Sequence, residues 1–351
     1  MKKKLLIIDK SQYGYLVDVF KWCTYLQPTF DITVVCFDTG RKRQSTPGVR
    51  VVYVPWKGPY AFRGILFLLY AFFFAAIHSG SIIVEYFTRC EVLPRLLFWK
   101  KKMALDIRTL SISENEEIRK ASDANVRRAT RYFRKIFLIS KPLNETLQIP
   151  QEKLHILPLG SDPLSLQEKD FSALRLLYVG TLSGRKIEKT LSGLALFVQK
   201  HSSAPIHYDI IGDGFHNEIS FLRNEAQRLG IDHIVTLHGR IPHEELTPFF
   251  DRCNVGLSFV PITPFYDHQP PTKTYEYILS GLFCIATATQ CNRQIVSPAN
   301  GTLITDTPEG VCEGLETFLT QKDHLQSATI RRSLSDCTWP EIVNKHLANN
   351  L

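Results

Sequence analysis

The chain has 351 residues, of which 44% are apolar and 22% are charged, and its net charge is +8. This is the composition of a globular protein long enough for two hydrophobic cores, and it excludes a disordered or fibrous chain. The eight cysteines include no Cys-x-x-Cys pair, so we expect reduced thiols and no zinc site.

The positive charge is concentrated in the first half. Residues 1–165 hold 26 Lys and Arg against 14 Asp and Glu, whereas residues 166–351 hold 16 against 20. A basic half predicts an anionic partner, such as a membrane surface or a lipid diphosphate. Nucleic acid is not expected, because no recognised binding motif accompanies the basic clusters. These clusters are residues 2–4, 41–43, 100–102 and 119–135.

Short apolar runs alternate with helical patterns along the first half. The run at residues 5–9 is too short for the core of a secretory signal, so we expect the first strand of a sheet there. Such alternation predicts a parallel sheet covered by helices. We expect further strands at residues 32–37, 51–54, 81–85, 102–107, 136–140 and 155–157, and helices at 13–26, 92–99 and 114–134.

One segment of the first half is unusually apolar. Residues 64–77 read GILFLLYAFFFAAI, which is shorter than the roughly 20 residues that span a bilayer. A helix that is apolar on all sides is either buried or lies at a membrane interface. We favour a core helix whose outer aromatic side chains could also touch lipid.

The second half repeats the alternation after a proline-rich and charged linker at residues 158–171. Two doubly wound domains are therefore predicted, and ligands of such folds bind at the carboxyl ends of the strands. We expect strands at 174–179, 208–212, 235–238, 255–259 and 283–286, and helices at 187–201, 219–229, 244–252, 272–280 and 311–319.

The segment PPTKTYEYILSG at residues 270–281 carries the clearest chemical signal. The prolines suit the residues before a helix, and Thr272 can cap it. Lys273 and Glu276 are three residues apart and share one face of the first turn, where exposed N–H groups favour phosphate. A cation, N–H groups and a carboxylate together suit a nucleotide diphosphate. The alternative is a surface Lys–Glu pair on an ordinary helix.

Several motifs of the second half follow one another in a characteristic order: LLYVG (176–180) with SGRK (183–186), IIGDG (210–214), LHGRIP (237–242), DRCNVGLSFVP (251–261), the helix start above and NGTLI (300–304). In this order and spacing they resemble the donor domain of GT-B glycosyltransferases, and they are most similar to the retaining family 4 group. HILPLG (155–160) and CTWP (337–340) resemble the segments that flank the linker and the C-terminal helix of that family.

The resemblance implies an α/β GT-B fold, with two doubly wound, Rossmann-like parallel-sheet domains facing a central cleft. Residues 1–165 would form the acceptor-side domain and residues 166–330 the nucleotide-sugar donor domain. Residues 331–351 would form a C-terminal helix that packs back on the first domain.

The resemblance also implies roles for residues of the donor site. Glu276 would hold the ribose hydroxyls. The donor diphosphate would meet Gly14, Arg185, Lys186 and Lys273, and the base would lie near Gly212, Gly214 and the backbone of Arg240 and Ile241. The alternatives are a solvated loop for Arg185 and Lys186, and turn formation alone for Gly14 and Gly212.

Two positions depart from the family pattern. His268 stands where the family usually places the first of two acids, with Asp267 one residue out of register, so we expect His268 on the donor-sugar side. Thr181 stands where the family often has Arg, which leaves the diphosphate to Arg185, Lys186 and Lys273.

The acceptor side is predicted from a strand end. Asp106 could act as a base or orient the acceptor hydroxyl, and Arg108 could bind an acceptor phosphate. The alternative is an Asp–Arg pair that closes the strand end, and Glu85 is a second candidate. The chain has no Asp-x-Asp triplet, so we expect no catalytic metal.

We therefore expect a metal-independent, hexosyltransferase-like glycosyltransferase without a cofactor, acting in surface polysaccharide or lipopolysaccharide biosynthesis. It would move a sugar from a nucleotide diphosphate sugar to a hydroxyl of a glycan acceptor, plausibly lipid-linked, at the cytoplasmic face of an anionic membrane. The alternatives are a non-catalytic GT-B-like partner protein and a GT-B-fold epimerase or phosphorylase. A nicotinamide enzyme is disfavoured, because Asn217 replaces the third glycine of the dinucleotide fingerprint that starts at Gly212.

Overall fold

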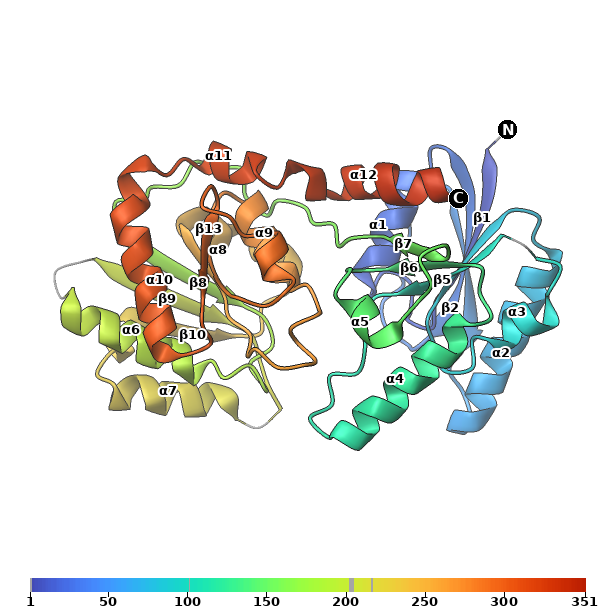
Figure 1. Cartoon of the computed structure of the whole chain (residues 1–351), viewed down its shortest axis with the longest axis horizontal. Coiled ribbons are helices and arrows are strands. Elements are labelled where there is room, and N and C mark those ends of the chain that lie inside the picture. The colour runs from blue at the N-terminus through green and yellow to red at the C-terminus, as the bar shows by residue number, and fades with distance from the viewer. Residues whose placement is uncertain (1, 101, 202–204, 216) are drawn as a thin grey trace. The chain divides into compact units, whose positions relative to one another are not determined.

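The computed structural model describes residues 2–100, 102–201, 205–215 and 217–351, so Lys101 of the basic clusters lies outside the described residues. The chain forms two compact units (Figure 1): unit 1 contains residues 1–160 and 339–351, and unit 2 contains residues 161–338. These boundaries differ from the expected ones at 165 and 330. The reason is that the N–H of Ser161 donates to the carbonyl of Cys337 at 3.0 Å, and Ser161 forms a β-bridge with Thr338.

Unit 1 is built on a seven-stranded sheet in the order β3-β2-β1-β4-β5-β6-β7. All neighbouring strands are parallel, and the strand order reverses direction between β1 and β4. The strands are β1 (Lys3–Ile8), β2 (Phe30–Asp38), β3 (Val49–Pro55), β4 (Ser81–Glu85), β5 (Met103–Ile107), β6 (Lys135–Leu138) and β7 (Leu154–Ile156).

Five helices of unit 1 connect these strands: α1 (Val17–Leu26), α2 (Tyr60–Ile77), α3 (Val92–Leu96), α4 (Glu116–Thr130) and α5 (Leu143–Leu147). Helix α1 starts four residues later than expected, because Gly14 has a φ of +89° in the preceding turn. Helix α5 was not expected from the sequence.

Helix α2 corrects the prediction of a core helix. It has 18 residues and is long and apolar enough, by length and composition, to cross a membrane. In unit 1 it packs on β1, β2 and β3, and only Phe67, Ala71 and Ala75 of its residues are buried. The other apolar side chains of α2 are partly or fully exposed in the structure. The prediction failed because a helix that is apolar all round shows no polar face from which its exposed side could be recognised.

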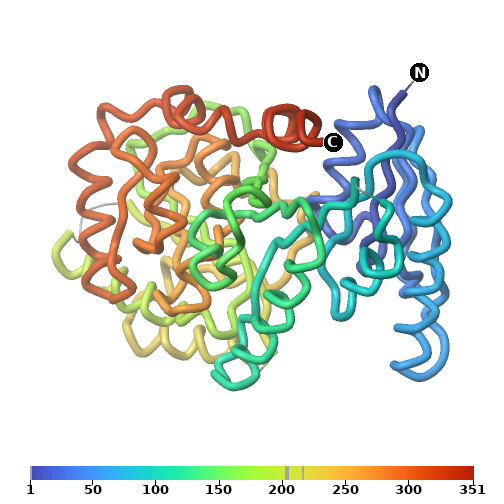
Figure 2. Tube along the Cα trace, turned by 45° about the vertical axis from the view of Figure 1, so that its right-hand side comes forward, coloured from blue at the N-terminus to red at the C-terminus, as the bar shows by residue number. Residues whose placement is uncertain are grey.

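The C-terminal end of the chain packs on α1 of unit 1 (Figure 2). Its described residues do not form the single expected helix: α11 (Ser327–Arg332) belongs to unit 2, whereas α12 (Trp339–Ile342) and a π-helical turn (Val343–Leu347) belong to unit 1. The Trp339 ring leaves no room for a side chain at Gly160, where a Cβ would lie 2.5 Å from it. Lys135 donates to the carbonyl of Asn350 at 2.6 Å.

Unit 2 is built on a six-stranded parallel sheet in the order β10-β9-β8-β11-β12-β13, which reverses direction between β8 and β11. The expected α/β fold with two doubly wound parallel sheets is thus confirmed. The strands are β8 (Leu174–Val179), β9 (Ile206–Ile211), β10 (Val235–Gly239), β11 (Val255–Ser258), β12 (Phe283–Thr287) and β13 (Gly301–Ile304).

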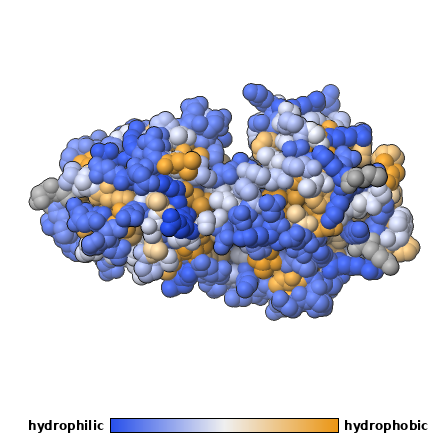
Figure 3. Space-filling view, turned by 90° about the horizontal axis from the view of Figure 1, so that it is seen from above, coloured by the Kyte–Doolittle hydropathy of each residue, from blue (hydrophilic) through white to orange (hydrophobic). Residues whose placement is uncertain are grey.

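Helices cover the sheet of unit 2 on the described residues. These helices are α6 (Glu188–Lys200), α7 (Glu218–Arg228), α8 (Thr247–Arg252), α9 (Thr272–Leu279) and α10 (Pro308–Gln321). Helix α9 packs on β11 and β12, and α10 packs on α6 and β13. The face drawn in Figure 3 is mainly hydrophilic and is interrupted by apolar patches.

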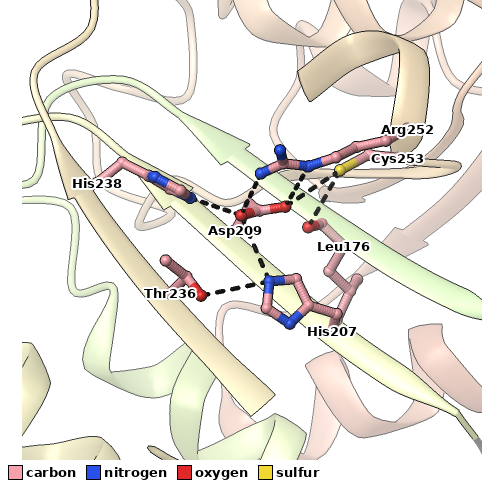
Figure 4. Close-up of polar contacts among 7 residues, drawn as sticks. All are labelled: Leu176, His207, Asp209, Thr236, His238, Arg252 and Cys253. Carbon is pink, nitrogen blue, oxygen red and sulfur yellow. Dashed lines mark hydrogen bonds and ion pairs between the residues drawn. The ribbon is translucent and has the colours of Figure 1, made fainter. Parts of the chain in front are cut away.

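A buried carboxylate ties β9 to its neighbours in unit 2 (Figure 4). Asp209 on β9 is 1% exposed, and its oxygens accept hydrogen bonds from Arg252 at 2.8 and 3.2 Å. The Nε2 of His238 on β10 lies 2.6 Å from the same carboxylate. Burial opposes ionisation, but the hydrogen bonds from Arg252 and His238 outweigh it and lower the pKa of Asp209. The charge is therefore paired and stabilises the fold.

Replacing this carboxylate tests its structural role. We expect Asp209→Ala to lower the free energy of unfolding by about 3 kcal/mol, because Arg252 and His238 lose their shared acceptor. The control is Glu316→Ala, which removes an exposed ion pair with Lys200 at 3.0 Å and should cost no more than about 1 kcal/mol. Chemical denaturation measures both; equal losses would contradict the assignment.

Candidate functional site

The helix start singled out in the sequence forms as α9, with one difference at its cap. Pro271 takes the N-cap position and Thr272 is the first helical residue, with no side-chain cap hydrogen bond. Thr272 is therefore not the cap that the sequence predicted. At the other end Gly281 has a φ of +80°, and its N–H donates to the carbonyl of Ile278 at 2.9 Å. This left-handed residue ends the helix, as expected.

The ammonium group of Lys273 lies at the carboxyl end of β8, beside the point where the strand order reverses. It lies 3.8 Å from the ring centroid of Tyr178, and a Cβ at Gly180 would lie only 2.9 Å from it. Burial and the neighbouring guanidinium of Arg185 lower the pKa of Lys273. Among the described residues this ammonium group forms no hydrogen bond or ion pair, and the carboxylate of Glu276 opposes the fall in its pKa only through space. It is a cation held at the edge where doubly wound folds bind ligands.

A second cation supports the same position. The guanidinium of Arg185 stacks 4.0 Å from the ring centroid of Tyr266. Its Nη1 is buried and has no hydrogen-bond partner among the described residues. A buried guanidinium nitrogen without an acceptor is costly unless an anion meets it. Arg185 and Lys273 interact electrostatically, so two cations lie near one another at this edge of the sheet, an arrangement suited to an anion. Lys186, by contrast, is exposed, with a φ of +57° before α6.

The carboxylate of Glu276 is held by a residue that the sequence did not predict. Its Oε1 lies 3.0 Å from Nε2 of His243, and its side chain is 12% exposed. His243 lies in a 3-10 turn (His243–Glu245) that follows β10. The second carboxylate oxygen of Glu276 can accept further hydrogen bonds, for example from a diol. Sequence reasoning missed His243 because no spacing rule links it to Glu276, which is 33 residues away.

The glycines assigned to the base lie on the same edge of the sheet. The N–H of Gly212 donates to the carbonyl of Gly239 at 2.9 Å, and a Cβ at Gly212 would lie 1.8 Å from the carbonyl oxygen of Gly180. Gly212 is therefore required by packing, whatever its role in binding. Arg240 and Ile241 directly follow β10, which pairs with β9.

Gly214 is also in a crowded position. A Cβ there would lie 2.4 Å from the carboxyl group of Glu218 and 2.6 Å from Oγ of Ser183. Ser183 donates a hydrogen bond to Glu218 and accepts one from the N–H of Phe215 at 2.8 Å. The loop after β9 is thus ordered by polar contacts to the loop after β8.

His268 is surrounded by polar partners rather than by open space. Its Nε2 lies 3.1 Å from Nε2 of Gln290 and 3.8 Å from Oδ2 of Asp267. Oδ1 of Asp267 accepts a hydrogen bond from the N–H of Gln290 at 2.8 Å. The acid that is out of register in the sequence therefore fixes the loop that carries His268.

The acceptor-side candidates of unit 1 lie at the carboxyl edge of its sheet. Asp106 on β5 is 0% exposed, and neither carboxylate oxygen has a hydrogen-bond partner among the described residues. Arg108 donates to the carbonyl of Leu157 at 2.8 Å and to the carboxylate of Asp18, and it lies 3.7 Å from Asp106. Its guanidinium is therefore committed to protein groups. At Gly14, a Cβ would lie 2.3 Å from Cγ of Gln44.

Asp18, Glu85 and Asp106 interact with Arg108, and Asp9 interacts with Glu85 and Asp18. We call the four carboxyl groups of Asp9, Asp18, Glu85 and Asp106 the acid cluster. Asp9 follows β1 and Glu85 ends β4, the two strands between which the order reverses. Burial raises the pKa values of Asp9 and Glu85, and the neighbouring Asp9 raises the pKa of Glu85 further. Burial raises the pKa of Asp106 to about 7, against the opposing effect of Arg108. The sequence predicted Asp106 and Glu85 but not Asp9 or Asp18. No group of three or more His, Cys, Asp or Glu suited to a metal ion occurs among the described residues.

The raised pKa of Asp106 predicts a pH-dependent stability. Between about pH 4 and 7 the folded chain binds more protons at Asp106 than the unfolded chain, so the free energy of unfolding falls as the pH rises through this window. The loss is on the order of 2–4 kcal/mol, since one unit of pKa corresponds to about 1.4 kcal/mol. Asp106→Asn should reduce this fall, because the neutral amide has no proton to lose.

Denaturation at several pH values from 4 to 8, followed by circular dichroism, measures this effect. The exposed Asp31→Asn is the control and should keep the wild-type slope. A wild-type slope in Asp106→Asn would show that Asp106 ionises freely in the fold.

Known proteins resemble this chain in sequence over part of its length and in fold over nearly all of it. Residues 173–321 match the family model for glycosyl transferases group 1. The sequence has no significant match among curated proteins. Solved structures give matches over the whole chain.

HepE from Anabaena, in complex with UDP and glucose, is 14% identical with a TM-score of 0.73, and the match covers 98% of each chain. Sucrose-phosphate synthase from Thermosynechococcus elongatus is 14% identical with a TM-score of 0.75, over 98% of this chain and 97% of that one. The lipopolysaccharide outer core galactosyltransferase WaaB is 15% identical with a TM-score of 0.69, over 99% and 100%. At these identities the likeness establishes the fold. The chain thus has the GT-B fold seen in glycosyltransferases, and within unit 2 residues 173–321 match the family model for glycosyl transferases group 1.

Proposed function

We propose that this protein is a glycosyltransferase that moves a sugar from a nucleotide diphosphate sugar to a hydroxyl of a glycan acceptor. The observation that carries the proposal is the pair of cations, Lys273 and Arg185, at the carboxyl edge of the unit 2 sheet. Neither forms a hydrogen bond or ion pair with an anion among the described residues, since Glu276 attracts Lys273 only through space. Nη1 of Arg185 is buried without an acceptor. A diphosphate supplies the missing acceptors.

The same pair explains how transfer would be assisted. The leaving nucleoside diphosphate gains negative charge as the glycosidic bond breaks, and two fixed cations stabilise that charge more than the charge of the intact donor. Glu276, positioned by His243 at 3.0 Å, would bind the ribose hydroxyls. Lys186 would add a mobile positive charge beside Arg185. The base would lie against the backbone at Gly212, Gly214, Arg240 and Ile241, and His268 would lie on the donor-sugar side.

Solved structures of the same fold support a nucleotide sugar as donor. HepE has been solved with UDP, with UDP and glucose, and with UDP-glucose. WaaB and WaaG are described as acting in lipopolysaccharide outer core transfer and lipopolysaccharide biosynthesis. We propose a related role in surface polysaccharide assembly on a lipid-linked acceptor.

On the acceptor side we assign different tasks to Asp106 and Arg108. A carboxyl group with a pKa of about 7 suits proton exchange near neutral pH, so Asp106 is our candidate for receiving or orienting the acceptor proton. Arg108, which is bonded to Asp18 and the Leu157 carbonyl, holds the acid cluster together in place of its expected contact with an acceptor phosphate.

The donor site is tested by nucleotide binding. A thermal-shift screen of nucleoside diphosphates should give one stabilising base, because a ligand of the folded state raises its stability. For that nucleotide, Lys273→Ala and Glu276→Ala should each weaken the affinity about tenfold or more in calorimetry. Lys200→Ala, an exposed cation on α6, is the matched control and should bind normally. Unchanged affinity in both site variants would refute the placement, and no stabilisation by any nucleotide would favour a non-catalytic partner protein.

We also propose that unit 1 associates with the cytoplasmic face of an anionic membrane. Exposed apolar side chains on α2 include Ile65, Leu69, Phe73 and Ile77, and the basic clusters belong to the same unit. Apolar insertion and attraction to anionic lipid together favour interfacial binding.

Liposome flotation tests this association. The wild-type chain should float with vesicles that contain anionic lipid and should be released in part by high salt. The double variant Leu69→Glu/Phe73→Glu should lose most of its binding, since both side chains are already exposed and the fold does not need them. Phe221→Glu, at an exposed position on α7 of unit 2, should float like the wild type. Flotation of the double variant at the wild-type level would exclude α2 as the membrane contact.

A further inference from the structure

A cavity of about 320 Å³ opens in unit 1 between α2 and the carboxyl ends of the sheet strands. Its apolar walls include Phe37 at the end of β2, Trp56 after β3 and Phe87 after β4. Phe37 contacts the Trp56 ring edge to face at 4.6 Å between centroids, which fixes this corner of the wall. The size falls in the range of ligand sites, which are mostly apolar with a few placed polar groups.

Three cations line the same cavity: Lys10, Arg63 and Arg89. The Arg63 guanidinium stacks 4.1 Å from the ring centroid of Trp56, and its Nε is buried without a hydrogen-bond partner among the described residues. The Lys10 ammonium lies 5.5 Å from the ring centroid of Phe87. No carboxylate lines the cavity or pairs with these three side chains in the described part of the chain. Such a wall has unsatisfied donors for an anion, and it is apolar elsewhere.

The cavity continues onto an exposed apolar surface. Ile65 lines the cavity and is 57% exposed, and it is followed along α2 by Leu69, Phe73 and Ile77. Residues at a spacing of four lie on one face of a helix, so these four side chains form a row that starts at the cavity wall. We call this row the α2 stripe. A flexible apolar chain that leaves the cavity would follow it.

The cavity lies at the same edge of the unit 1 sheet as the acid cluster. Lys10 directly follows Asp9, and Phe87 follows Glu85 by two residues, so the cavity and the acid cluster lie at the same edge of the unit 1 sheet, on the loops after β1 and β4. Asp106 lies on β5, which pairs with β4. A phosphate held by Lys10, Arg63 and Arg89 would therefore lie on the side of unit 1 that holds the candidate acceptor base.

We propose that this cavity binds the phosphate or diphosphate head and the first apolar units of a prenyl-type lipid, with the rest of the chain along the α2 stripe. The inference rests on the proposed function, for which it identifies the lipid anchor of the acceptor. The cations select the phosphate, the aromatic wall selects the chain, and the absence of a lining carboxylate among the described residues excludes a cationic head group.

The test uses the full chain and farnesyl diphosphate as the probe, with farnesol and inorganic pyrophosphate as the two half-ligands. Calorimetry should show binding of farnesyl diphosphate at least tenfold tighter than binding of either half-ligand. Equal affinity for farnesol would overturn the role of the cations, and equal affinity for pyrophosphate would overturn the role of the apolar wall. Binding only to anionic vesicles would reduce the site to a membrane contact and refute the cavity.

Two variants test whether farnesyl diphosphate binds in the cavity. Arg63→Gln should weaken binding about tenfold, because it removes a charge while keeping most of the side chain. Gly64 lines the cavity, and a Cβ there meets no atom within 4 Å. Gly64→Leu should therefore fill the space and abolish binding, while the helix itself favours a leucine over a glycine. Arg50→Gln is the matched control, since Arg50 lies 5.9 Å from the Phe74 ring outside the cavity. Wild-type affinity in both cavity variants would overturn the proposal.

The thermal shift caused by the nucleotide that stabilises the wild type distinguishes a failure of this inference from a failure of the proposed function. All variants should keep its thermal shift, which also shows that they are folded. Nucleotide binding without binding of farnesyl diphosphate would refute the lipid site alone. If the chain binds farnesyl diphosphate but no nucleotide, the transferase function is refuted and the lipid site in the cavity still stands.

Discussion

The chain leaves β8 and β9 along paths so close together that position 212 has no room for a side chain. The edge of the unit 2 sheet that carries the candidate donor site depends on this close approach. A Cβ at Gly180 would lie 2.9 Å from the Lys273 ammonium, and one at Gly212 would lie 1.8 Å from the Gly180 carbonyl oxygen. Only a residue without a Cβ at position 212 allows the ends of β8 and β9 to meet so closely. The half-buried ammonium group of Lys273 lies at this edge of the sheet, 3.8 Å from the ring centroid of Tyr178.

The two units treat buried charge in opposite ways. In unit 2, Asp209 is fully paired with Arg252 and His238, so this charge stabilises the sheet. The cations Arg185 and Lys273 form no hydrogen bond or ion pair with an anion among the described residues. In unit 1, three acids of the acid cluster share Arg108, and burial raises the pKa of Asp106 to about 7. Paired charges maintain the fold, whereas unpaired charges of either sign mark the edges where we place the donor diphosphate and the acceptor proton.

Helix α2 connects the charge distribution of unit 1 with its apolar surface. One side of the helix is buried through Phe67, Ala71 and Ala75, and the other leaves large apolar side chains in contact with solvent. Exposed apolar surface of this kind marks an interaction site when basic residues surround it. The cavity beside α2, with its aromatic wall and three cations, extends this surface into the carboxyl edge of the sheet. A lipid-linked acceptor would use both features at once.

The sequence by itself determined the two doubly wound sheets, because alternating buried strands and helices leave few other arrangements. It also determined α9 with Lys273 and Glu276, since prolines before a helix and a glycine after it are local signals. The tertiary structure decided which residues from distant parts of the chain meet, because local signals hold no information about such contacts. His243 meets Glu276, Asp9 and Asp18 join Asp106 and Glu85, and α2 leaves its apolar face exposed, because each depends on residues brought together from distant parts of the chain. Periodicity shows which residues can be buried, and only packing decides which of them are.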